Sequence, residues 1–349
     1  MELAAVTWRG ASSIKLFSML HQTADTLYSY PIATIVVAVI VLMALTAVAN
    51  FILAQRAERL NPPKGRVISA QGVRLHYLEQ GRSGPALVLL HGNGSMIEDF
   101  VSSGLIEGAA RKYRVIAFDR PGFGHSHRPR NKVWTPENQA QAIRAALAEI
   151  GISEFLVLGH SWGTFVALAL AMRYPQSVKA LILVSGYYFP SPRADVVLFS
   201  APAIPIVGDI LRYTVSPIVS RLIWPLLLAK IFGPAPIPTK FKQLFPKEMA
   251  VRPSQLRASA ADSALMIPAA TTLQKDYRGL PMPVVIAAGA EDKFVESDQS
   301  ARLHSDIPGS TLRIIPRNGH MVHQTATIEI MEAIDTAASL GRTRDTAAA

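Results

Sequence analysis

Four short apolar runs constrain the fold of this chain more than any other feature of its sequence. They are Ala86–Leu90, Arg114–Phe118, Phe155–Leu158 and Ala180–Val184. Continuous apolar runs of this length are typical of parallel strands that are buried on both faces. Between the second and third runs, Thr135-Pro136-Glu137 predicts the start of a helix and Gly151 predicts its end. The alternation of strand and helix predicts an α/β fold with a mostly parallel sheet.

The segments on either side extend this pattern. Two alternating stretches, Val67–Ser69 and Val73–Glu79, predict an antiparallel hairpin, and Pro283–Ala288 and Thr311–Ile315 predict two further strands. Many prolines and apolar residues interrupt the pattern between them. We therefore expect one core domain in two parts with a helical cap inserted between them. The predicted boundaries are 66–186 for the first part of the core, 187–276 for the cap, 277–340 for the second part and 341–349 for a frayed tail.

A charge-free apolar segment precedes this domain. Residues 31–54 are long enough, at about 24 residues, to cross about 30 Å of hydrocarbon as a transmembrane helix. Ala47-Val48-Ala49 leaves a cleaved signal peptide as the alternative. Residues 1–30 form a leader, expected as an interfacial helix or a disordered tail. Residues 55–65 are expected as a linker, since Pro62 and Pro63 prevent a helix from continuing.

Charge indicates a lipid partner and an orientation. The formal net charge is +10, but basic residues are scattered and no nucleic-acid-binding motif is present, so we expect the lipid bilayer and no nucleic acid as a partner. Four basic residues follow the apolar segment closely, whereas only Lys15 lies comparably close before it. This bias predicts a single-pass protein with its catalytic domain in the cytoplasm. The chain has no cysteine, which excludes disulfides and thiol catalysis.

The sequence Gly159-His160-Ser161-Trp162-Gly163 lies between a predicted strand and a helix rich in alanine and leucine. This is the context of a nucleophile elbow, a sharp strand-to-helix turn that presents a serine hydroxyl. Small residues at 159 and 163 permit such a turn, and the helix N-terminus favours developing negative charge. Ser161 is therefore the candidate nucleophile.

A serine hydroxyl needs a base, and the base needs an acid. His320 follows the last predicted strand and is the candidate base, while His323 is expected in the next helix, behind the site or on the surface. Asp292 follows the preceding strand and is the candidate acid, although Glu291 remains an alternative. Glu296 and Asp298 are weaker alternatives, expected at the start of the next helix.

A tetrahedral intermediate also needs donors for its oxyanion. The backbone N–H groups of Trp162 and Asn93 are the candidates, because Trp162 follows the serine and Asn93 lies in a loop after a buried strand. His91 is expected to brace that loop by hydrogen bonding rather than to act in catalysis.

The motifs HGNG, DRPGFGHS, GHSWG, GAEDKF and NGHMVH stand in the order found in the α/β-hydrolase fold superfamily, which the chain resembles over about residues 67–338. The resemblance implies an eight-stranded, mostly parallel sheet, a serine-acid-histidine triad, an inserted lid and no cofactor. It also implies a structural role for Asp119. Asn93 and Trp162 resemble the halide-binding pair of haloalkane dehalogenases, but those enzymes attack with a carboxylate where this chain has Ser161.

The sequence thus predicts a membrane-anchored serine hydrolase that cleaves a hydrophobic carboxylic ester through an acyl-enzyme. Acyl transfer and amide or peptide cleavage remain alternatives, because they use the same triad. A receptor or scaffold without activity is an alternative of another class. The exact substrate and the oligomeric state do not follow from the sequence.

Overall fold

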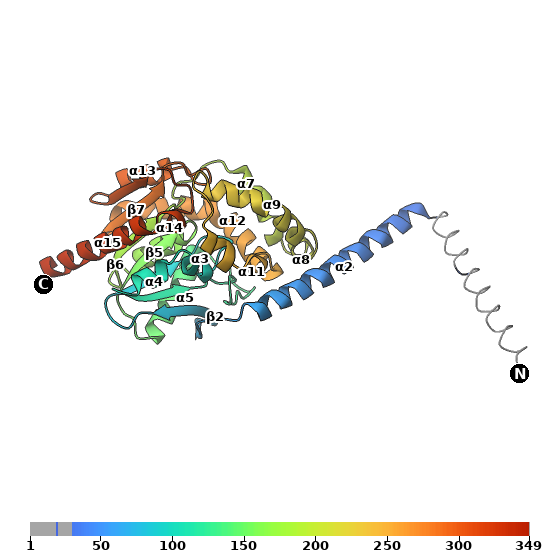
Figure 1. Ribbon diagram of the computed structural model, residues 1–349, viewed down its shortest axis with the longest axis horizontal. Coiled ribbons are helices and arrows are strands. Elements are labelled where there is room, and N and C mark those ends of the chain that lie inside the picture. Colours follow the sequence, from blue (N-terminus) through green and yellow to red (C-terminus); the bar gives the residue numbers. More distant parts are fainter. Residues whose placement is uncertain (1–18, 20–29, 349) are drawn as a thin grey trace, which may run out of the picture. The chain divides into compact units, whose positions relative to one another are not determined.

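The computed structural model describes residue 19 and residues 30–348. These described residues fall into two compact units, which are divided between Ala49 and Asn50. The leader prediction for 1–30 lies almost entirely outside the described residues. The second unit contains a central sheet with helices on both faces (Figure 1). Its strands are β1 (Arg66–Ala70), β2 (Val73–Gln80), β3 (Ala86–Leu90), β4 (Arg114–Phe118), β5 (Phe155–His160), β6 (Val178–Val184), β7 (Val284–Gly289) and β8 (Thr311–Ile315).

The eight strands lie in the order β1-β2-β4-β3-β5-β6-β7-β8. β2 pairs antiparallel with β1 and β4, and the pairs from β4 through β8 are parallel. This confirms the predicted α/β fold, the hairpin and the mostly parallel eight-stranded sheet. The parallel strands end at one edge of the sheet, where the loops that follow them meet.

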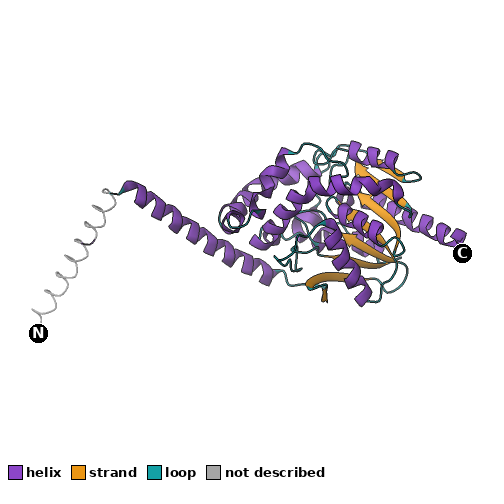
Figure 2. Ribbon diagram, turned by 180° about the vertical axis from the view of Figure 1, so that it is seen from behind, coloured by secondary structure: helices purple, strands orange, loops and turns teal. Residues whose placement is uncertain are grey.

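Alternate residues of each strand pack against opposite helical layers, as the period of two requires. Val88 and Leu90 belong to a core with α5 (Pro136–Glu149) and α6 (Gly163–Arg173), whereas Leu87 and Leu89 belong to a core with other helices. The helices of this second layer are α3 (Ile97–Ser102), α4 (Leu105–Ala109) and α15 (Thr327–Ala348). Both sides of the sheet are therefore covered (Figure 2), which explains why the strands read as continuous apolar runs.

The cap consists of helices inserted between β6 and β7. They are α7 (Ala194–Ser200), η1 (Ala201–Ala203), α8 (Val207–Tyr213), α9 (Val215–Phe232), α10 (Thr239–Leu244), α11 (Lys247–Ala250), α12 (Pro253–Leu273) and η2 (Gln274–Gly279). The remaining short helices, α13 (Asp298–Asp306) and α14 (Val322–Thr325), follow β7 and β8. The helical nature of the insertion is thus as expected, while its exact limits stay a prediction.

The apolar segment 31–54 lies within α2 (Pro31–Leu60), which is long and apolar enough to cross a membrane. Two predictions need correction. The linker predicted at 55–65 is helical up to Leu60, because the first residue that resists helix formation is Pro62. The tail predicted at 341–349 continues α15 as far as Ala348, since no proline interrupts it and Gly341 packs against the backbone of Lys179.

Candidate active site

Ser161 lies at the turn from β5 to α6 in the left-handed backbone region, with φ of 52°. The turn requires the backbone on either side of Ser161 to pass close to neighbouring backbone atoms, at Gly159 and Gly163. A Cβ at Gly163 would lie 2.2 Å from the Leu90 carbonyl oxygen, and one at Gly159 would lie 2.5 Å from that of Gly163. The hydroxyl stands partly exposed beside the carboxyl edge of the sheet. The structure therefore has the strained strand-to-helix turn that the sequence predicts.

His320 and Asp292 converge on this serine from two loops. Nε2 of His320 lies 2.9 Å from Ser161 Oγ, and Nδ1 lies 2.8 Å from Asp292 Oδ2. Both His320 and Asp292 are buried. The structure thus brings all three predicted triad residues together in one hydrogen-bonded chain, although 28 residues separate the acid from the base and 159 separate the base from the serine.

The geometry distinguishes the two acids that the sequence left open. The other oxygen of Asp292, Oδ1, accepts hydrogen bonds from the backbone N–H groups of Phe294 and Val295 at 2.8 and 2.9 Å. These bonds fix the carboxylate, so that Oδ2 faces the imidazole. Glu291 instead accepts a hydrogen bond from the Asn318 backbone at 3.1 Å, and Asp298 begins α13. Among these carboxylates, Asp292 is the one in contact with His320.

The two candidate oxyanion donors lie in the loops that flank Ser161. Gly92, next to Asn93, approaches the serine so closely that a Cβ there would lie 3.0 Å from Ser161 Cβ. Within the described part of the chain, the backbone N–H groups of Asn93 and Trp162 have no hydrogen-bond acceptor. Both are therefore free to donate to a charged oxygen near Ser161.

The side chains of Asn93 and Trp162 are used differently, since both bind the cap helix α12. Asn93 Nδ2 donates to the Ser259 carbonyl at 3.1 Å and to Ser263 Oγ at 3.0 Å. Trp162 Nε1 donates to the Asp262 carbonyl at 2.9 Å. The side-chain N–H groups of Asn93 and Trp162 thus bind the cap helix α12. In this they differ from the halide-binding pair of haloalkane dehalogenases, which these two residues resemble in sequence.

A buried ion network reinforces this junction. Asp262 accepts hydrogen bonds from Arg120 at 2.7 Å and from Arg128 at 2.8 Å, and all three side chains are at most 5% exposed. Gln255, about two turns before Asp262 on the same helix, donates to the carbonyls of Gly94 and Ser95 at 3.3 and 3.2 Å. Sequence reasoning missed these α12 residues, because nothing in an inserted segment of irregular pattern indicates which of its residues contact the core.

A second buried cluster lies behind His320. Asp99 Oδ1 is 3.0 Å from His323 Nε2, and His160 Nε2 donates to the His320 carbonyl at 3.1 Å. Burial, together with the charges of His323 and His320, holds the pKa of His160 well below its ordinary value. Burial alone would raise the pKa of Asp99, but its interaction with His323 leaves that pKa lowered. The structure places His323 behind the site rather than on the surface.

Asp99, His160 and His323 each offer one atom that could bind a metal ion, and these three atoms lie within 4.8 Å of one another. Among the described residues, this cluster has the spacing of a metal site. The carboxylate of Asp99 and Nε2 of His160 have hydrogen-bond partners, whereas in the described part of the chain Nδ1 of His160 and both ring nitrogens of His323 have none beyond the Asp99–His323 ion pair. Asp99 accepts hydrogen bonds from Ser95 at 3.0 Å and from Gln324 at 2.7 Å, and His160 binds the His320 backbone. We therefore interpret the cluster as a support for the His320 loop.

Two structural roles predicted from the sequence are confirmed. His91 contacts the Gly92 carbonyl at 2.8 Å and accepts from the Arg120 N–H at 3.0 Å, which braces the loop. Asp119 binds His76 and the backbone N–H groups of Ile97 and His125, at 2.7 to 2.9 Å.

A profile of the family described as "alpha/beta hydrolase fold" matches residues 85–327, well over half of the chain. This protein belongs to the alpha/beta hydrolase fold family. Among curated relatives, 2-hydroxymuconate semialdehyde hydrolase of Pseudomonas putida is 27% identical over 264 residues, which are 76% of this chain and 90% of that protein. As a member of a family whose matched relatives are hydrolases, the chain is identified as a hydrolase.

Solved structures share the fold. A thermophilic esterase from Thermogutta terrifontis matches with a TM-score of 0.64 and 20% identity, covering 78% of this alpha/beta hydrolase and 96% of the esterase. A membrane phospholipase A, described as a bacterial virulence factor, matches with a TM-score of 0.59 and 19% identity. That match covers 94% of this chain and 99% of the phospholipase.

Proposed function

We propose that this alpha/beta hydrolase is a membrane-anchored serine hydrolase that cleaves a hydrophobic carboxylic ester through an acyl-enzyme. The observation that carries the proposal is the hydrogen-bonded chain from Ser161 through His320 to Asp292, with distances of 2.9 and 2.8 Å. This arrangement can deprotonate the serine, hold the imidazole in one tautomer and stabilise the imidazolium that forms.

In the first half of the reaction, Ser161 Oγ forms a bond to the acyl carbon while its proton passes to His320 Nε2. The N–H groups of Asn93 and Trp162 hold the oxyanion of the tetrahedral intermediate, a contribution of about 3 kcal/mol per donor in related chemistry. The bond to the alcohol oxygen then breaks as His320 returns the proton to that oxygen, and the alcohol leaves.

In the second half, water attacks the acyl carbon and gives one proton to His320. The bond from the acyl carbon to Ser161 Oγ breaks, the proton returns to Oγ, and a carboxylic acid leaves. Throughout, Asp292 remains ionised and orients the imidazole. These steps need no cofactor.

The apolar character of the cap and of α2 supports the proposed substrate class and location. Anchoring by α2 would place the domain beside lipid, where hydrophobic esters partition. The match with a membrane phospholipase A over most of both chains supports this combination of anchor and ester hydrolysis. Basic residues after the span favour a cytoplasmic domain.

The triad is tested by a fluorophosphonate probe together with a series of p-nitrophenyl esters of increasing acyl length. We expect wild-type protein to be labelled and to prefer long acyl chains, and Ser161→Ala to lose both labelling and activity. Ser305→Ala, an exposed serine on α13, is the matched control and should retain both. Undiminished activity in Ser161→Ala would exclude the mechanism, and absence of labelling in the wild type would favour an inactive scaffold.

The substrate and topology are tested separately. A panel of esters, lactones, amides and 2-hydroxymuconate semialdehyde, with and without an alcohol acceptor, distinguishes ester hydrolysis from amide cleavage, acyl transfer and the reaction named for the Pseudomonas putida relative. Protease digestion of the C-terminal domain should occur only after sealed spheroplasts are opened. Digestion in sealed spheroplasts would place the domain outside.

A further inference from the structure

We propose that the apolar face of the cap, formed by exposed side chains of α7, η1, α8 and α9, lies in the surface of the bilayer. The proposal rests on the membrane anchoring by α2 proposed above and adds a second membrane contact. The most exposed members of this face are Leu198, Ile206, Leu222 and Leu226, each at 73 to 76%. Exposed apolar surface of this extent marks a site for a partner or a membrane rather than for water.

α9 shows the feature most sharply. A helix that is apolar on all sides is normally buried in a core or lies in a membrane. α9 has the length and composition of a membrane span, yet only 11% of its residues are buried within the protein. Its C-terminal end is held by the core, where the Met321 N–H donates to the Ile231 carbonyl at 3.1 Å. Its middle is held by Arg221, which binds Glu248 of α11 at 2.8 Å.

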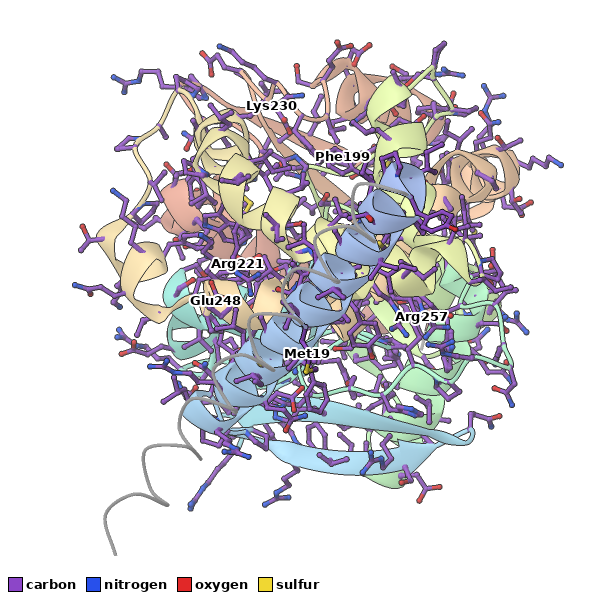
Figure 3. The ribbon with its side chains drawn as sticks, turned by 90° about the vertical axis from the view of Figure 1, so that its right-hand side faces the viewer. Met19, Phe199, Arg221, Lys230, Glu248 and Arg257 are labelled. Carbon is purple, nitrogen blue, oxygen red and sulfur yellow. The ribbon has the colours of Figure 1, made fainter. Side chains whose placement is uncertain are left out.

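These two attachments prevent α9 from crossing a bilayer while it remains part of the cap. With one side packed and the other exposed, it can lie along the membrane surface with its apolar side chains among the acyl chains. In Figure 3, Arg221 and Glu248 lie beside one another, and Phe199 and Lys230 mark α7 and the end of α9 on the same side of the molecule.

The end of α2 adjoins this face. Asn50 is 4% exposed, and its Nδ2 donates to the carbonyls of Tyr213 and Thr214, at the junction of α8 and α9, at 2.8 and 3.2 Å. Arg221 completes the junction by donating to Asn50 Oδ1 at 3.0 Å. Phe51 and Ile52, the next residues of α2, are more than half exposed. The part of α2 from Asn50 onward thus packs against the cap at the junction of α8 and α9, and we take the membrane proposed for the residues before it as the occupant of the apolar face.

Charge next to the face fits an anionic lipid surface. Asp209 of α8 is the shared partner of Arg130 and Arg212, at 2.9 and 2.8 Å. Arg257 of α12 donates to the Arg128 carbonyl at 3.4 Å, two residues before Arg130. The two guanidinium groups on the single carboxylate of Asp209 leave an excess of positive charge beside α8, which would favour phosphate-bearing lipid headgroups.

Depth labelling of the full-length protein in vesicles tests the proposal. The chain has no cysteine, so Leu222→Cys and Leu226→Cys can each carry a single environment-sensitive fluorophore. Leu340→Cys is the matched control, because it is an exposed leucine of α15, a helix whose C-terminal end lies on the opposite side of the domain from α8 (Figure 1). We expect lipids with spin labels on their acyl chains to quench positions 222 and 226 at least twofold and to leave position 340 unchanged.

A label at Leu42→Cys in α2 separates this inference from the proposed anchoring. Quenching at 42 without quenching at 222 and 226 would overturn the cap contact and leave the anchor intact. Absence of quenching at 42 would instead reject the anchor. The fluorophores at 222 and 226 could instead report an apolar environment in lipid-free detergent to the same extent as in vesicles. If light scattering also showed a dimer, a second copy of the chain would cover this face, and the proposal would be overturned.

Activity provides a second test. The double variant Leu222→Glu/Leu226→Glu should keep wild-type turnover of a soluble short-chain ester, which reports an intact active site. Its turnover of a long-chain ester embedded in vesicles should fall at least tenfold, and more steeply with phosphatidylglycerol than with phosphatidylcholine alone. Leu340→Glu should change neither rate. Equal rates of the double variant and the wild type on vesicles would contradict the proposal.

Discussion

Nε2 of His160 donates a hydrogen bond of 3.1 Å to the backbone carbonyl of His320, so the residue that precedes Ser161 is tied to the loop carrying the imidazole opposite it. The two loops come from β5 and β8, which are not neighbours in the sheet. This bond and the Asp99–His323 pair behind it connect the serine turn and the histidine loop independently of the triad itself.

Loss of this donor should lower turnover without weakening substrate binding. His160→Phe keeps an aromatic ring but leaves the His320 carbonyl unpaired, at a cost of about 1 to 2 kcal/mol. If that cost falls on the reactive arrangement, kcat on a short ester should decrease about tenfold. KM should change less than twofold. His304→Phe, on the surface of α13, is the control, and an unchanged kcat in His160→Phe would show that the bond does not position His320.

Substitution of the acid should distinguish Asp292 from its neighbour. Asp292→Asn removes the charge that stabilises the imidazolium and favours the wrong tautomer, so kcat/KM should fall by roughly two to four orders of magnitude. Glu291→Gln retains an oxygen that can accept from the Asn318 N–H and should lower kcat/KM less than threefold. Steady-state kinetics of the two variants measures the difference, and a larger loss in the Glu291 variant would reverse the assignment.

The ion network between cap and core should contribute strongly to stability. Asp262→Ala leaves Arg120 and Arg128 buried without their carboxylate, which should cost about 3 to 5 kcal/mol and lower Tm by about 10 °C. Asp306→Ala breaks the ion pair with the exposed side chain of Arg278 and should cost less than about 1 kcal/mol. Thermal unfolding in detergent compares the two; similar Tm values would mean that the buried network is not stabilising.

Acid should destabilise the fold partly through His91. Burial and the charge of Arg120 lower the pKa of this imidazole to about 4, so it stays neutral in the folded state while the unfolded state binds a proton below about pH 6.5. Its contribution is complete above pH 6.5 and is lost as pH falls toward 4, amounting to about 3 kcal/mol.

His91→Gln can still bond to the Gly92 carbonyl and the Arg120 N–H but does not titrate. Between pH 7 and 4.5 its free energy of unfolding should therefore decline less steeply than that of the wild type. Part of the decline should remain, because burial also lowers the pKa of His160. Parallel pH profiles of the two proteins would contradict the assignment to His91.

Most of the sheet, and the juxtaposition of the three candidate triad residues, could be predicted from the sequence, because each depends on local signals. Continuous apolar runs marked the strands, and the loops after β5, β7 and β8 had to meet at one edge, which brought Ser161, Asp292 and His320 together. The choice between Asp292 and Glu291 could not be made, since adjacent loop residues differ only in the direction of their side chains.

The contacts of α12 were beyond sequence reasoning for a different reason. Asp262 reads as a single acid in an alanine-rich stretch, and its partners Arg120 and Arg128 lie more than 130 residues earlier in the chain. No periodicity relates them. Likewise, His160 reads as part of the serine motif, whereas its role in the structure depends on a loop formed 160 residues later.

The attachment of α12 restricts how a substrate gains entry. A swing of the whole cap away from the sheet would separate Asp262 from two arginines and from the Trp162 indole, and would release Asn93 as well. It would disturb the two loops that carry the candidate oxyanion donors Asn93 and Trp162. These contacts hold α12 to the core, so any opening of the cap that preserves the buried network must leave α12 in place.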